Sequence, residues 1–114
     1  MYTCFPTIEC KDGFSFSVQA SARHWCSPRS NSGPYKNVEV GYPSEQEDLL
    51  KEYQECNNDS RDAVYPFVPI GVVQSIVEKH GGTNLIGRIT LKTLCEGGEK
   101  EEIKSLLHYL AHTE

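Results

Sequence analysis

A segment of eight residues, 14–21, alternates strictly between apolar and polar side chains, and it limits the possible folds more than any other feature of the sequence. Its apolar members are Phe14, Phe16, Val18 and Ala20. Because successive side chains of a strand point to opposite faces, this period of two predicts a strand that buries one face. The pair Asp12-Gly13 in front of it is typical of a hairpin turn, so 7–10 and 14–21 are expected to form a β-hairpin.

The other elements are predicted from apolar spacing and from the positions of glycine and proline. Ser44 and Glu47 have the spacing of a helix capping box, which predicts a helix from 44 to about 55. Pro66 restricts 63–68 to an edge strand or an extended connection. We further expect a strand at 37–42 and helices at 69–80 and 99–112. Residues 85–94 fit either a strand or a helix, and their threonine and isoleucine content favours the strand.

This order of elements predicts an α+β fold, an antiparallel sheet with three helices packed mainly on one face. With 114 residues the chain is expected to form one domain, 1–114, and it shows no internal repeat or linker. No apolar run approaches the roughly 18 residues that span a membrane, and no secretory signal leads the sequence. A cytoplasmic protein without a membrane partner is therefore expected.

The negative charge is concentrated in one segment. Residues 45–62 hold seven acidic and two basic side chains, which accounts for the whole formal net charge of −5. Such a segment is either a solvated helix face or a surface that attracts a basic protein. In the second case, the partner-binding residues are expected to be Glu45, Glu47, Asp48 and Glu52. The negative net charge also argues against direct binding to duplex nucleic acid.

A basic and aromatic cluster follows the alternating strand, in the irregular stretch 22–36. Guanidinium groups can hold a phosphate, and aromatic faces can hold a base, so this stretch is a candidate for binding a nucleotide-like anion. The expected ligand-binding residues are Arg23, His24, Trp25, Arg29 and Tyr35. In the simpler alternative, Trp25 caps the core and both arginines are solvated.

Cysteine and histidine positions give weak support for catalysis or metal binding. The five cysteines are odd in number and include no Cys-x-x-Cys pair, so most are expected to be buried as free thiols. Cys26 and His24 could act as a nucleophile and a base, which leaves a small cysteine-dependent enzyme as an alternative. His108 and His112 have metal-ligand spacing, but no third ligand is defined, so no metal, cofactor or catalytic residue is assigned.

Three segments resemble small accessory proteins encoded in phage and prophage genomes. They are the stretch from FSFSVQAS to HWCSPR at 14–29, VYPFVP at 64–69 and EKHGG at 78–82, so the resemblance spans residues 14–82. It implies a mobile-element origin, and it assigns no ligand-binding or catalytic residue to this chain. Small phage proteins without enzyme motifs often bind a component of bacterial immunity.

The sequence therefore predicts a phage-encoded, non-enzymatic binding protein that antagonises bacterial immunity. One mechanism is sequestration of a nucleotide-like small molecule, within one chain or between the subunits of a homo-oligomer. The other is the blocking of a basic surface on a host defence protein such as a CRISPR effector. A structural module of a virion is a further alternative, for which self-association into a ring or fibre is expected.

Overall fold

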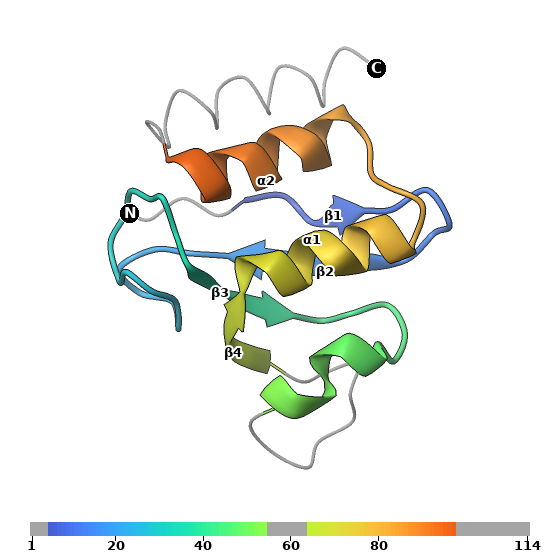
Figure 1. Cartoon of the computed structure of the whole chain (residues 1–114), viewed down its shortest axis with the longest axis horizontal. Helices are drawn as coiled ribbons and strands as arrows, with labels where there is room; N and C mark the ends of the chain where they lie inside the picture. The colour runs from blue at the N-terminus through green and yellow to red at the C-terminus, as the bar shows by residue number, and fades with distance from the viewer. Residues whose placement is uncertain (1–4, 55–63, 98–114) are drawn as a thin grey trace.

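A computed structural model of the protein describes residues 5–54 and 64–97. It shows a four-stranded antiparallel sheet with three helices, which confirms the predicted α+β fold (Figure 1). The strands lie in the sheet in chain order and are β1 (Ile8–Glu9), β2 (Ser15–Gln19), β3 (Asn37–Gly41) and β4 (Val64–Pro69). The helices are the 3₁₀ helix η1 (Asp48–Tyr53) and the α-helices α1 (Ile70–Lys79) and α2 (Leu85–Glu96).

The alternating segment forms β2 and pairs with β1 in the predicted hairpin. Ile8 lies opposite Phe16 in the register of the two strands. In the turn, Asp12 Oδ1 accepts a hydrogen bond from the Phe14 N–H at 2.9 Å, and Gly13 has a φ of 99°, which a residue without a Cβ adopts freely. All four apolar side chains of the segment, Phe14, Phe16, Val18 and Ala20, are buried. They form the apolar face that the alternation predicts.

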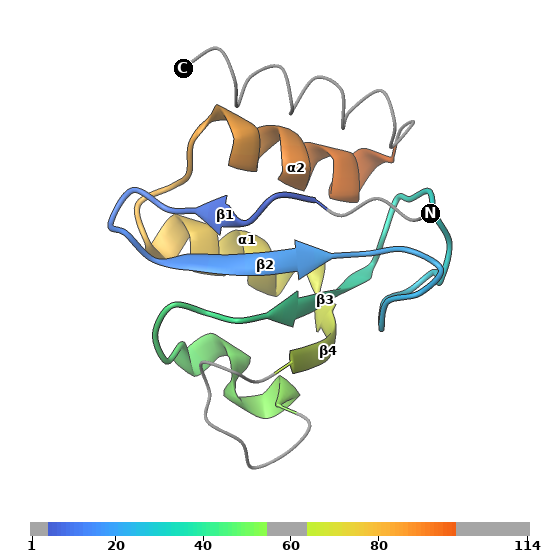
Figure 2. The same cartoon turned by 180° about the vertical axis from the view of Figure 1, so that it is seen from behind.

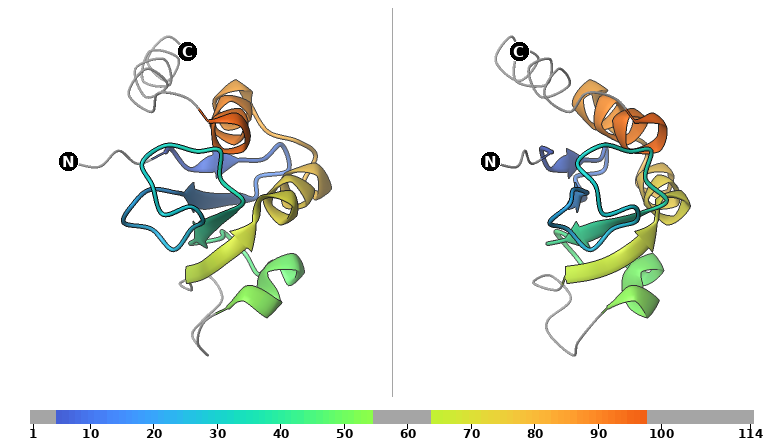
Figure 3. Two further views of the ribbon diagram at one scale, coloured as in Figure 1. Left: turned by 60° about the vertical axis from the view of Figure 1, so that its left-hand side comes forward. Right: turned by 90° about the vertical axis from the view of Figure 1, so that its left-hand side faces the viewer.

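The three helices lie on one side of the sheet. Figure 1 shows α1 in front of the strands, and Figure 2, seen from behind, shows β2 in front of α1. Figure 3 shows α2, α1 and η1 along that side, with α2 near β1 and η1 near β4. The edge position of β4 agrees with the presence of Pro66 in it. Within 5–54 and 64–97, no helix is long and apolar enough to cross a bilayer.

The segment 85–94 belongs to helix α2, so the preference for a strand over a helix there was wrong. The side-chain oxygen of Asn84 caps the helix by accepting a hydrogen bond from the Gly87 N–H at 2.8 Å. Inside the helix, Thr90 and Thr93 donate their hydroxyls to the carbonyl oxygens four residues earlier. Both threonine side chains are buried, and these bonds satisfy their hydroxyls. Threonine, which favours strands, is therefore accommodated in this helix.

The helix expected at 44–55 is shorter and begins later. Its N-cap is Glu47, whose Oε2 accepts a hydrogen bond from the Leu49 N–H at 2.9 Å. The predicted cap, Ser44, instead accepts a hydrogen bond at its Oγ from the Ser15 N–H at 2.9 Å. A tertiary contact with β2 therefore uses the side chain that the capping box required. The helix expected at 99–112 lies outside the described residues.

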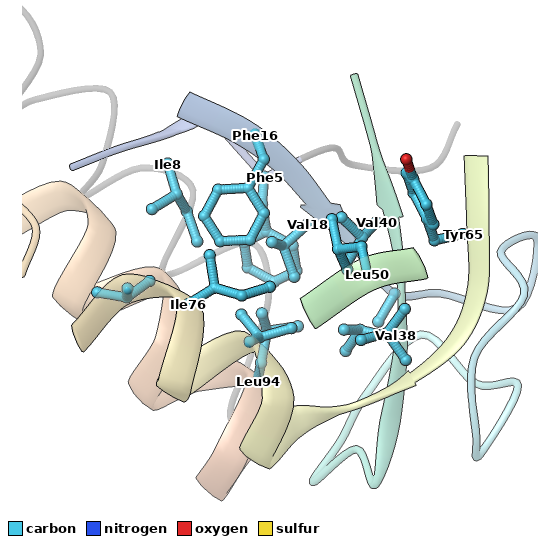
Figure 4. Close-up of a cluster of buried hydrophobic side chains, with 14 of the residues drawn as sticks. Phe5, Ile8, Phe16, Val18, Val38, Val40, Leu50, Tyr65, Ile76 and Leu94 are labelled. Atoms are coloured by element: carbon cyan, nitrogen blue, oxygen red, sulfur yellow. The ribbon is translucent and has the colours of Figure 1, made fainter. Parts of the chain in front are cut away.

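The core fills the space between the sheet and the helices (Figure 4). Leu50 of η1, Ile76 of α1 and Leu94 of α2 enter it, and each is fully buried. Full burial of a leucine contributes roughly 1.5–3 kcal/mol relative to exposure. Because Leu50 is the buried residue of η1, it fixes that helix against the protein and leaves Asp48 and Glu52 at the surface.

Candidate binding surfaces

The acidic residues predicted to bind a partner do not share one exposed face. Glu45, Asp48 and Glu52 are exposed. Glu47 differs from the expectation, because its side chain is only 1% exposed. Its role as the cap of η1 turns its carboxylate toward the protein, so it is not available to a partner at the surface.

The buried carboxylate of Glu47 joins η1 to the end of α1. Its Oε2 lies 2.8 Å from Lys79 Nζ, and its Oε1 lies 2.7 Å from His80 Nε2. Burial by itself raises the pKa of Glu47, but hydrogen bonds from Lys79, the Leu49 N–H and His80 outweigh it and hold the pKa below its ordinary value of 4.5. Glu47 is therefore a buried, ionised group that is neutralised by its neighbours.

His80 lies between two carboxylates. Its Nδ1 is 2.6 Å from Asp12 Oδ2, and the ring of Phe14 stacks on the imidazole with 4.1 Å between centroids. Because an ionised carboxylate only accepts hydrogen bonds, both ring nitrogens act as donors, which defines the imidazolium form. Burial lowers the pKa of His80, but the hydrogen bonds with Glu47 and Asp12 outweigh burial and raise the pKa above 6.5. This network connects the β1–β2 turn, η1 and α1.

A groove lies between η1 and the start of α1. Its volume is about 390 Å³, which falls in the range of roughly 300–1,000 Å³ that is typical of ligand pockets. We call it the acidic groove, and its lining residues are Asp48, Leu49, Glu52, Pro69, Gly71, Val72 and Ser75. Leu49 is 39% exposed, so an accessible apolar wall stands beside two carboxylates, of which Asp48 Oδ1 lies 3.2 Å from Nζ of the exposed Lys51. The contacts of Glu47 with Lys79 and His80 hold together the two helices that form the walls.

Two of the five residues expected to bind a nucleotide are buried in the loop. His24 Nδ1 lies 2.7 Å from Ser21 Oγ. The hydroxyl of Tyr35 donates a hydrogen bond to the Ser30 carbonyl at 2.7 Å, and burial raises the pKa of Tyr35 to about 12. Both side chains therefore support the shape of the loop, and they do not present a polar group to a ligand at the surface.

The exposed part of the loop forms a packed cluster with one residue from β4. The guanidinium carbon of Arg29 lies 5.0 Å from the centroid of the Trp25 ring, a cation–π distance. The ring of Phe67 meets Trp25 edge-on, with 6.1 Å between centroids. Trp25 is 48% exposed and Phe67 is 42% exposed. We call Trp25, Arg29 and Phe67 the aromatic cluster; Arg23, the remaining candidate, is also exposed.

Phe67 is a surface residue that the sequence reasoning missed. It has a φ of 53°, a left-handed conformation that is rare for an aromatic residue, and it lies where the register of β4 against β3 shifts. Its N–H donates a hydrogen bond to the Trp25 carbonyl at 3.1 Å, and the Trp25 N–H donates to Glu39 Oε1 at 3.1 Å. The neighbouring Pro66 was the available signal, because proline in a strand often marks an irregular register.

The enzyme alternative rests on Cys26 and His24, and both side chains are buried beside Ser21. Cys26 Sγ donates a hydrogen bond to the Ser21 carbonyl at 3.1 Å, and the residue is 1% exposed. A substrate would have to open this part of the loop to reach the sulfur. In the part of the chain that the structure describes, no group of three His, Cys, Asp or Glu side chains is arranged to hold a metal ion. His108 and His112 lie outside that part.

No protein-family model matches the chain, no curated protein matches it, and no solved structure matches it.

The two surfaces differ in what they can bind. The acidic groove offers apolar contact and two carboxylates in one concave place. In the aromatic cluster, the Trp25 ring is already in contact with Arg29 and Phe67. In the groove, an incoming cation can approach Glu52 and compete with the exposed Lys51 for Asp48. The cluster, in contrast, is a preassembled group that can itself be inserted into a partner.

Proposed function

We propose that this chain is a non-enzymatic binding protein whose acidic groove docks a cationic segment of a partner protein. The proposal is supported by one observation, the exposed Leu49 side chain in a groove that also contains Asp48 and Glu52. A lysine or arginine side chain has the complementary composition, an apolar stem and a charged head. With its stem against Leu49 and Val72, the head of such a side chain would lie beside the two carboxylates.

The charge distribution favours a basic protein as the partner. In the described part of the segment, the exposed side chains Glu45, Asp48 and Glu52 outnumber the exposed Lys51, so the field around the groove attracts cations and repels phosphates. Attraction of this kind speeds encounter and is weakened by salt. Apolar contact with Leu49 adds a part of the binding energy that salt does not screen.

The partner that we propose is a host defence protein with a basic surface, such as a CRISPR effector. The resemblance of residues 14–82 to phage and prophage proteins supports this choice by analogy. Occupying a surface that otherwise contacts nucleic acid would inhibit the partner without any chemical reaction, so no catalytic group is required.

A titration followed by NMR tests the groove directly. The probe is a short peptide of alternating arginine and leucine, and its counterpart with glutamate in place of arginine is the negative control. We expect saturable shifts of the amides of Leu49, Glu52 and Val72 with the first peptide only, and weaker binding at higher salt. Equal shifts with both peptides, or shifts spread evenly over the protein, would contradict the proposal.

Charge reversal provides the matched comparison. The double variant Asp48→Lys, Glu52→Lys should lose peptide binding. The variant Glu9→Lys, Glu96→Lys changes the net charge equally at exposed positions outside the groove and should retain it. Glu47 is left unchanged, because replacing a buried carboxylate would disturb the fold. If both double variants lose binding equally, the effect comes from net charge and not from the groove.

The biological role is tested in bacteria that carry an active CRISPR system. Expression of the chain should raise the plating efficiency of a targeted phage, and the Asp48→Lys, Glu52→Lys variant should not. The Glu9→Lys, Glu96→Lys variant should behave as the unmodified chain does. Unchanged plating across several defence systems would contradict antagonism of immunity while leaving the peptide result intact.

Sequestration of a nucleotide-like ligand is the second proposal, with less support from the geometry. The contact between Arg29 and Trp25 favours it, because a guanidinium group beside an aromatic ring suits a phosphate next to a base. The burial of His24 and Tyr35 removes two of its five expected contacts. Calorimetry against cyclic and linear nucleotides tests it, and the absence of heat with every member of the panel would reject it.

A further inference from the structure

The loop that carries the aromatic cluster has the charge opposite to that of the groove. Residues 21–36 contain Arg23, Arg29 and Lys36 and no acidic residue, although the protein as a whole carries −5. Two large aromatic side chains, Trp25 and Phe67, are about half exposed beside Arg29. The chain therefore displays a cationic and apolar group of the kind that its own acidic groove suits.

We propose that the aromatic cluster of one copy of this chain seats in the acidic groove of a second copy. The inference rests on the proposed cation-binding character of the groove and names an occupant for it. In this contact, the Arg29 guanidinium lies beside Asp48 and Glu52, and the Trp25 ring packs against Leu49. Tryptophan and arginine are the residues that most often dominate the energy of protein interfaces.

The positions of the two surfaces permit a closed dimer. They adjoin on β4, where Phe67 belongs to the cluster and Pro69 lines the groove. Two residues along a strand span only about 7 Å. With both surfaces next to one another, a two-fold axis beside β4 can place each cluster in the groove of the other copy, so that the same contact forms twice.

The cluster is prepared for insertion before any partner arrives. The contact of Arg29 with Trp25 and the edge-on packing of Phe67 restrict three side chains that would otherwise lose freedom on binding. The left-handed φ of Phe67 and its N–H bond to the Trp25 carbonyl fix the position of its backbone. A strained residue that is held in place at the surface is typical of a binding site.

A second copy suits the cluster better than an external acidic protein or a nucleotide. Two copies carry the same net charge of −5, so the attraction between them comes from local charges, the basic residues of 21–36 in one copy and the carboxylates of the groove in the other. The groove also supplies the apolar wall that Trp25 requires, through Leu49 and Val72.

Sedimentation velocity of the full chain over a wide concentration range tests the inference. We expect a monomer–dimer equilibrium whose dissociation constant increases with salt concentration. Arg29→Glu and Trp25→Ala should each raise that constant by about tenfold or more, since each removes a contact that is made twice. Arg88→Glu, an equal charge change at an exposed position of α2, should leave it unchanged.

Mixing two variants gives the decisive measurement. Arg29→Glu places an acidic loop against an acidic groove, and Asp48→Lys, Glu52→Lys places a basic loop against a basic groove, so each variant alone should be monomeric. In the mixture, one interface pairs the reversed loop with the reversed groove and the other pairs the two unaltered surfaces. A heterodimer should therefore form, with a dissociation constant close to that of the unmodified chain.

The remaining outcomes overturn the inference. A chain that is monomeric at all concentrations rejects self-association, and if it still binds the arginine–leucine peptide, the proposed function of the groove stands. A dimer that is insensitive to Arg29→Glu and Trp25→Ala assigns the interface to another surface. A dimer that loses stability with both variants but is not recovered in the mixture assigns the cluster to a partner site other than the groove.

Discussion

His80 Nε2 and Glu47 Oε1 lie 2.7 Å apart, and this contact links η1, whose N-cap is Glu47, to α1, which ends just before His80. The second carboxylate on the ring, Asp12, adds the β1–β2 turn to the same connection. Because Glu47 is almost completely buried, its charge depends on His80 and Lys79 for compensation. The walls of the acidic groove are therefore held by groups whose charge changes with pH.

Stability is expected to be highest between about pH 4.5 and 6.5, the ordinary pKa values of Glu47 and His80. The folded pKa of His80 is raised, so its contribution is complete below 6.5 and is lost as pH rises through the folded value. The folded pKa values of Glu47 and Asp12 are lowered, so their contributions are lost as pH falls through the folded values. Urea denaturation at a series of pH values measures the loss of stability on the acidic side and on the alkaline side of this range.

The variant His80→Gln tests whether His80 causes the loss of stability at alkaline pH. It should be less stable than the unmodified chain at pH 6 and should show a much smaller loss as pH rises to 9. His24→Gln is the control, because Glu47 forms its hydrogen bonds with Leu49, Lys79 and His80 and not with His24. If the loss of stability at alkaline pH persists in His80→Gln and disappears in His24→Gln, the assignment to His80 is wrong.

Replacing Glu47 by alanine should destabilise the protein by about 2–4 kcal/mol. Loss of one partner from a buried ion pair costs about 3–5 kcal/mol, and loss of an N-cap costs about 1 kcal/mol, but the half-exposed Lys79 can recover hydration. Glu45→Ala, two residues away and exposed, should remain within about 0.5 kcal/mol of the unmodified chain. The free energy of unfolding in urea gives both values, and similar losses for the two would refute the buried role of Glu47.

Tyr42 is a second residue with a left-handed backbone, with a φ of 51° and a side chain that is 64% exposed. Tyr42→Gly removes the conformational cost without removing buried packing, whereas Tyr42→Ala keeps a Cβ in the same conformation. We expect the glycine variant to be more stable than the alanine variant by about 1 kcal/mol. Thermal and urea unfolding compare the pair, and a more stable alanine variant would contradict the conformation at Tyr42.

The thiol of Cys26 should react slowly in the folded protein. It is 1% exposed and hydrogen-bonded to the Ser21 carbonyl, whereas Cys95 is only partly buried. Alkylation at neutral pH followed by peptide mass spectrometry should therefore modify Cys95 well before Cys26, and denaturant should remove the difference. Rapid modification of Cys26 in the native state would revive the enzyme alternative.

The strand pattern was accessible from the sequence because it depends on local chemistry. The alternation in 14–21 and the Asp12-Gly13 turn each involve neighbouring residues, and the structure forms both. Pro66 likewise indicated an edge strand, since it lacks an N–H for a second neighbour. The separation of charge between 21–36 and 45–62 can also be counted directly in the sequence.

The sequence pattern was misleading where a distant residue competes for a side chain. Ser44 fits a capping box, but Ser15 uses its hydroxyl, and Glu47 becomes the cap and is buried. Threonines that favour a strand are accommodated in α2, because their hydroxyls bond within the helix and their other atoms pack in the interior.

The sequence by itself determined the fold class, the first hairpin and the location of the opposite charges. Only the tertiary structure decided which charged residues are exposed, that Phe67 joins Trp25 and Arg29, and that a groove lies beside Asp48 and Glu52. The physical reason is the range of the interactions. Secondary structure follows from side-chain periodicity along one segment, whereas burial of Glu47 and exposure of Phe67 depend on partners that are many residues away in the chain.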